Sequence, residues 1–70
     1  MDRALKKLHR TLDSVACHNE SAALEIMRAA EKIPDDLMRQ RLLSVIHHLN
    51  HDADILRLVR DDVERVSRLG

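Results

Sequence analysis

Histidine and cysteine side chains are the residues of this sequence best suited to metal chemistry. Three of the five histidines lie close together, at 47, 48 and 51. On a helix, His47 and His51 share one face because they are four residues apart, so both could ligate one metal ion. Folding the chain at its middle would bring Cys17 and His18 to the same level. These four residues form a candidate zinc site, and together with His48 the histidines form a candidate pH-responsive switch, since imidazole titrates near neutrality. The alternative is a set of exposed polar residues.

No other arrangement in the sequence is typical of an enzyme. A single glycine excludes the usual nucleotide-binding loops, and a single cysteine excludes a disulfide framework. The carboxylates can all be assigned to helix surfaces or caps, and no glycine-containing turn holds a serine nucleophile. The absence of Phe, Tyr and Trp removes stacking platforms for single-stranded nucleic acid. We therefore expect no catalytic activity and no cofactor.

The elements that would position these residues are two helices in one domain spanning residues 1–70. Pro34 disfavours a helical conformation at Ile33, and Asp35 is a good cap for a new helix. The sequence predicts helices over about 2–33 and 36–69, joined by a turn at Pro34-Asp35. Helix propensity is poorest at residues 17–21. No apolar run is long enough to span a membrane and no signal peptide is evident, so we expect a cytoplasmic protein of bacterial or phage origin.

Both predicted helices carry apolar residues at alternating spacings of three and four, which is typical of a coiled coil. The first stripe is Leu5, Leu8, Leu12, Val15, Asn19, Ala22, Ile26, Ala29 and Ile33, and the second is Met38, Leu42, Val45, Leu49, Asp52, Leu56, Val59, Val63 and Val66. A hairpin folded at Pro34 pairs the two stripes in order, and their single polar members, Asn19 and Asp52, fall opposite one another. The sequence therefore predicts an all-α antiparallel two-helix hairpin, whose register this polar pair fixes.

A two-helix hairpin of this size cannot enclose a core, so a second apolar surface should bind another helix. Small or apolar residues flank one side of the stripes, at Ala16, Ala23, Ala30, Ile46 and Ala53. We expect two hairpins to dimerise through this flank into a four-helix bundle. Further apolar residues outside the stripes are candidates for binding a protein partner: Leu24, Met27, Leu43 and Leu58.

The net charge of zero hides an uneven distribution. Cations gather near both chain ends, which a hairpin places together, and they form a candidate surface for nucleic-acid phosphates. Its residues are Lys6, Lys7, Arg10, Arg57 and Arg60. The alternative is an ordinary solvated helix surface with charge pairs four residues apart, such as Asp61 with Arg65.

The stretch Leu49-Asn50-His51-Asp52-Ala53-Asp54-Ile55-Leu56 resembles a Leu-x-x-x-Ala-Asp-x-Leu segment in the second helix of the Rop family of plasmid copy-number regulators. Chain length and the position of the turn are similar too. The resemblance implies helical hairpins that pair into an antiparallel four-helix bundle. That family binds paired RNA hairpins with the help of an exposed aromatic residue on its first helix, which this chain lacks. The resemblance thus bears on architecture rather than on function.

Three functional hypotheses follow from the sequence. The preferred one is a non-enzymatic interaction module, such as a regulator, an anti-activator or a small chaperone, that acts as a homodimer and holds a protein partner on a helical face. The second is nucleic-acid binding through the basic end of the hairpin. The third is a metal- or pH-responsive switch at the histidine cluster.

Overall fold

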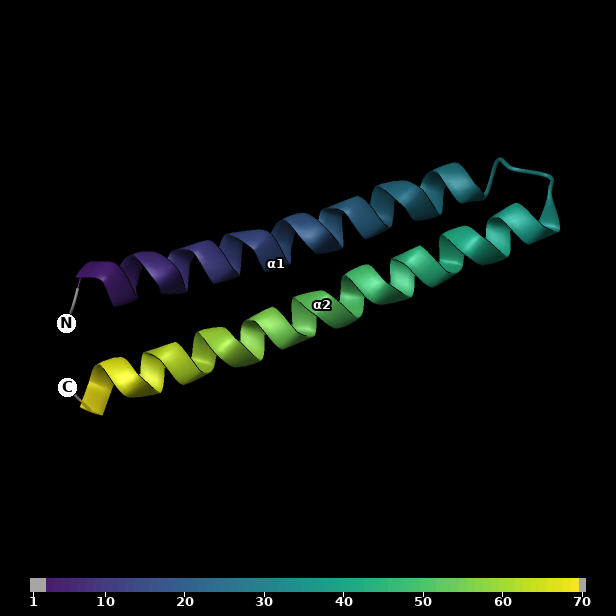
Figure 1. Ribbon diagram of the computed structural model, residues 1–70. Coiled ribbons are helices and arrows are strands. Elements are labelled where there is room, and N and C mark those ends of the chain that lie inside the picture. The colour runs from purple at the N-terminus through teal and green to yellow at the C-terminus, as the bar shows by residue number, and fades with distance from the viewer. Residues whose placement is uncertain (1–2, 70) are drawn as a thin grey trace.

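The computed structural model describes residues 3–69, which form two long helices and the loop between them. Helix α1 spans Arg3–Ala30 and helix α2 spans Asp36–Leu69. The helices run antiparallel, so the two chain ends lie together and the loop lies at the far end (Figure 1). The Cα trace measures 54 × 13 × 11 Å, and the described part of the chain contains no strand. Neither helix has an apolar stretch long enough to cross a membrane.

The loop has the structure that its proline and aspartates predict. Asp35 caps α2, because its Oδ1 accepts a hydrogen bond from the backbone N–H of Met38 at 3.1 Å. Helix α1 ends at Ala30, three residues earlier than expected. Its last turn tightens, with Lys32 N–H donating to the Ala29 carbonyl and Ile33 N–H to that of Ala30, both at 3.1 Å. Pro34 explains the early end, since the preceding residue cannot be helical. The expected first residue, Asp2, lies outside the described residues, and α1 is unbroken through 17–21.

The interhelical seam is built from alanines. The buried residues are Ala16, Ala23 and Ala30 on α1 and Ile46 and Ala53 on α2. Because residues 3–69 form only two helices, a side chain buried here is covered by the other helix and by neighbours on its own helix. These five residues are therefore packed inside a single hairpin and are not available to a second copy. The residues expected at a dimer interface thus lie in the seam of one hairpin instead.

The seam uses only half of each predicted apolar stripe. Between the buried alanines lie half-buried members of the stripes, such as Leu12, Ile26, Leu49 and Leu56. The other members are largely exposed. The seam is thus rotated by about 50° around each helix from the predicted position, half of the roughly 100° between consecutive residues. The physical reason is size, because methyl side chains let two helix backbones approach more closely than Leu or Val would.

Truncation of the one large buried side chain should test this seam. Ile46 is 3% exposed, so Ile46→Ala should lower the free energy of unfolding by roughly 3 kcal/mol through lost burial and a cavity. The matched control is Leu58→Ala on the same helix, where the side chain is 65% exposed and the change should stay below about 0.5 kcal/mol. Urea unfolding at one fixed protein concentration measures both. Equal effects of the two substitutions would contradict this seam.

Candidate interaction surfaces

An apolar face runs along one side of the hairpin. Its members directly precede seam positions in the sequence and recur every seven residues: Leu8, Val15, Ala22 and Ala29 on α1, and Met38, Val45, Val59 and Val66 on α2. In an antiparallel pair, equivalent heptad positions lie on the same side of the plane through both helix axes. The two rows therefore form one surface. Its large side chains are 40–57% exposed, although a coiled-coil pattern would normally bury them.

Asp52 is the charged member of the α2 row, and Asn19 lies beside the α1 row. Asn19 is half-buried in the seam, whereas Asp52 is exposed. No hydrogen bond joins these two side chains among those formed by residues 3–69. The hairpin therefore does not show the predicted polar lock within one chain. Asp52 instead interrupts the apolar face near its middle.

The opposite side of the hairpin is held by ion pairs between the helices. Glu20 accepts a hydrogen bond from Arg57 at 2.5 Å, and Asp13 accepts one from Arg60, also at 2.5 Å. Arg60 further donates to Asp61 at 3.0 Å. Glu20 comes four residues after the buried Ala16, and Arg57 comes four residues after the buried Ala53. The two side chains thus occupy equivalent heptad positions, and their ion pair places these positions on the same side of the hairpin. We call this the charged side.

These pairs favour the ionised forms of their members. The hydrogen bond from Arg57 holds the pKa of Glu20 below its usual range, and it outweighs partial desolvation, which acts in the opposite direction. The same bond raises the pKa of Arg57. The pKa of Arg60 is raised chiefly by its hydrogen bond to Asp13 and then by that to Asp61. Arg57 and Arg60, two of the five cations in the alternative phosphate-binding surface, are therefore engaged in ion pairs within the chain.

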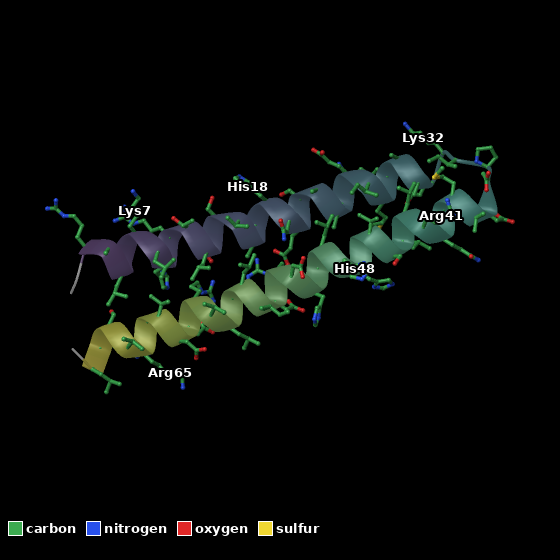
Figure 2. The ribbon with its side chains drawn as sticks, viewed as in Figure 1. Lys7, His18, Lys32, Arg41, His48 and Arg65 are labelled. Atoms are coloured by element: carbon green, nitrogen blue, oxygen red, sulfur yellow. The ribbon has the colours of Figure 1, made fainter. Side chains whose placement is uncertain are left out.

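The candidate metal ligands are not brought together. Among residues 3–69, no group of three or more His, Cys, Asp or Glu side chains is placed to hold a metal ion. His18 and His48 lie on outer sides of different helices (Figure 2). Cys17 instead lies beside the Arg57 guanidinium on the charged side. The structure thus separates Cys17 and His18 from His47 and His51, because helix neighbours in sequence point in different directions.

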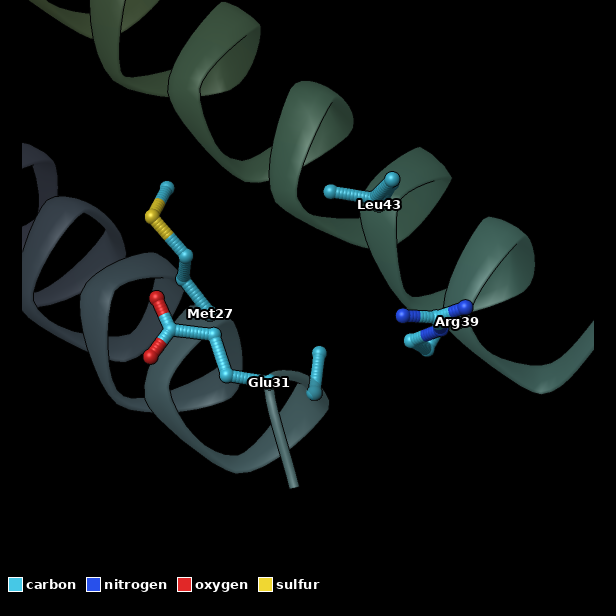
Figure 3. Close-up of a pocket in the computed structure, with 5 residues that line it drawn as sticks. Met27, Glu31, Arg39 and Leu43 are labelled. Carbon is cyan, nitrogen blue, oxygen red and sulfur yellow. The ribbon is translucent and has the colours of Figure 1, made fainter. Parts of the chain in front are cut away.

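Part of the predicted partner surface forms a hollow near the loop. Met27 and Leu43 line an open depression of about 270 Å³ together with Ala30, Glu31 and Arg39 (Figure 3). All four predicted partner-binding residues are exposed. They do not form one patch, however, because Leu58 belongs to the outer side of α2 and the hollow lies near the loop. Met27 and Leu43 are thus brought together, and Leu24 lies one turn from Met27.

Comparison with known proteins adds no relative: no family model, curated protein or solved structure matches this chain. The two-helix hairpin agrees with the helical architecture that the Rop-like segment implies. Family membership has no support beyond that segment.

The Glu20–Arg57 pair predicts a pH-dependent contribution to stability. A carboxylate whose pKa is lower in the folded state stabilises the fold above its unfolded pKa, and that contribution is lost as pH falls through the folded pKa. Glu20→Gln should therefore lower the melting temperature slightly at pH 7 and have less effect at pH 3. Because both side chains are solvent-accessible, added salt should also narrow the difference. Melting curves monitored by circular dichroism would check this, and a difference independent of pH would exclude the ion pair as its source.

Proposed function

We propose that this protein is a non-enzymatic interaction module that works as a homodimer, with the apolar face of one hairpin packed on the same face of a second copy. The observation that supports this proposal is the length of the face, which runs from Leu8 and Val66 near the chain ends to Ala29 and Met38 near the loop. Exposed apolar surfaces of this extent mark interaction sites. A second hairpin would complete a four-helix bundle.

The size of the face suits self-association. Its longer row runs from Met38 to Val66 on α2, which is about 42 Å at 1.5 Å per residue, and two adjacent helices of roughly 10 Å diameter make it roughly 20 Å wide. The resulting area of about 840 Å² is comparable to the roughly 800 Å² per partner of a standard stable interface. A two-fold axis brings the same patch of both copies together, so no second complementary surface is required.

The polar residues of the face would then act between chains. Near the middle of the face, Asp52 interrupts an otherwise apolar surface, and Asn19 lies half-buried beside the α1 row. A polar group within an apolar interface costs stability but penalises other alignments, in which it would lie against apolar side chains. We assign these two residues to fixing the relative position of the two hairpins. The hollow beside Met27 and Leu43 lies off the apolar face, so it stays available to a protein partner.

A charge placed on the apolar face should dissociate the dimer. Val45→Asp puts a carboxylate within the proposed interface, where its desolvation is unfavourable. Sedimentation equilibrium should give a mass near twice 8.1 kDa for the wild type and near 8.1 kDa for this variant. Leu58→Asp is the matched control, because it adds the same charge to the same helix on its outer side and should leave the dimer intact.

Two outcomes would refute the proposal. The first is a wild-type chain that is folded but remains monomeric over the concentrations used for both variants. The second is dissociation by Leu58→Asp with Val45→Asp still dimeric, since that would place the interface on the other side of α2. Helix content measured by circular dichroism would show that neither variant has simply unfolded.

A further inference from the structure

The first three turns of α1 carry a concentration of positive charge with no acidic residue among them. Residues 3–12 include Arg3, Lys6, Lys7 and Arg10 and contain no acidic residue. Two pairs of these cations, Arg3 with Lys7 and Lys6 with Arg10, are four residues apart on the helix. Such like-charge pairs destabilise a helix. The helix dipole adds further positive potential at the same end.

Several arginines elsewhere in the chain form ion pairs instead. The four arginines of α2 that form ion pairs are Arg39, Arg57, Arg60 and Arg65, with Asp36, Glu20, Asp13 and Asp62 among their partners. Among the ion pairs within residues 3–69, none involves Arg68 or the four cations of residues 3–12. Four arginines of α2 are thus paired, whereas the cations of residues 3–12 are not, and Glu64 is the one acidic residue that shares a hollow with them.

The unbalanced cations surround two adjoining hollows. Arg3, Lys6, Lys7 and Arg10 line one of about 330 Å³. Lys6 and Arg10 also line a second of about 310 Å³, which they share with His9 of α1 and with Glu64, Ser67 and Arg68 of α2. Both helices thus contribute to one concave basic surface. We call it the basic end and define it by Arg3, Lys6, Lys7, Arg10 and Arg68. Figure 2 shows Lys7 on the outer side of α1.

We propose that the basic end binds the phosphate backbone of a nucleic-acid duplex without reading its sequence. Clustered Lys and Arg gain affinity from phosphates by releasing condensed counterions. The hollows contain no apolar side chain. Apolar groups would be needed to insert into a membrane surface or to anchor a protein partner, whereas a phosphate backbone requires only cations and hydrogen-bond donors.

A duplex suits this surface better than a single strand. The chain has no Phe, Tyr or Trp, so it cannot stack on unpaired bases, which supply much of the affinity of single-strand binders. A duplex instead presents one charge per roughly 1.7 Å of its axis. This site is independent of the proposed dimer. Lys6 is seven residues before Asp13 and therefore lies toward the charged side, away from the apolar face.

The test is fluorescence anisotropy with a labelled 20-base-pair DNA duplex of mixed sequence, titrated with the full chain at several salt concentrations. We expect binding in roughly the 1–100 µM range at low salt, with a slope of log K against log salt of about −4.5 for five phosphate contacts. The double reversal Lys6→Glu/Arg10→Glu should weaken binding at least tenfold and reduce that slope by about 2.

The matched control is Lys32→Glu/Arg41→Glu, which changes the net charge by the same amount at the loop end of the hairpin. This variant should bind like the wild type. Equal losses in both variants would overturn the proposal, because total charge rather than the basic end would then govern binding. Tighter binding to single strands, to anionic lipid vesicles or to inorganic pyrophosphate at equal phosphate concentration would overturn it as well.

Discussion

Contact between the two helices is made largely by alanine methyl groups. This contact determines which apolar side chains stay exposed on the other sides of the hairpin. Ala16, Ala23 and Ala53 are almost completely buried, although each contributes little apolar area of its own. Their small size allows the helix backbones to approach closely. A pair of helices has only one strip of mutual contact, so close packing along the alanines leaves Val15 and Val45 outside it. The exposed apolar face is a direct consequence of the alanine seam.

Charge follows the same division of the molecule into sides. On the charged side, Glu20 with Arg57 and Asp13 with Arg60 connect the helices across the seam. These pairs are exposed to water and add little stability individually, but they limit how freely this side could pack on an apolar partner. The apolar face lacks such pairs. The first α1 turns carry four cations and no acidic residue, so a chain with no net charge still has a positive end.

The turn was predictable from the sequence because its causes are local. Pro34 and Asp35 act on their immediate neighbours, and α2 begins where the aspartate caps it. The rotation of the seam was not predictable from the apolar stripes alone. A periodic pattern identifies the apolar surface of a helix. It does not show which part of that surface packs against the other helix. That choice depends on the difference in size between Ala23 and Val15, and so on packing in three dimensions.

The candidate sites show the same limit. The ion pairs of Arg57 and Arg60 could not be predicted from the sequence, because their partners lie 37 and 47 residues away along the chain. The signal for the basic end was present, since residues 3–12 contain no acid, but Arg68 joins it only through folding. Likewise Met27 and Leu43 meet only because the hairpin brings them together.

The central claim is that the alanine seam is internal to one chain and that the apolar face contacts a second one. Isotope-filtered NMR on a mixture of ¹³C-labelled and unlabelled chains would test it directly, because it detects only contacts between different molecules. The account predicts intermolecular methyl contacts for Val15, Val45 and Val59, and none for Ala16 or Ala23. Intermolecular contacts at the buried alanines, and none at the three valines, would contradict the claim.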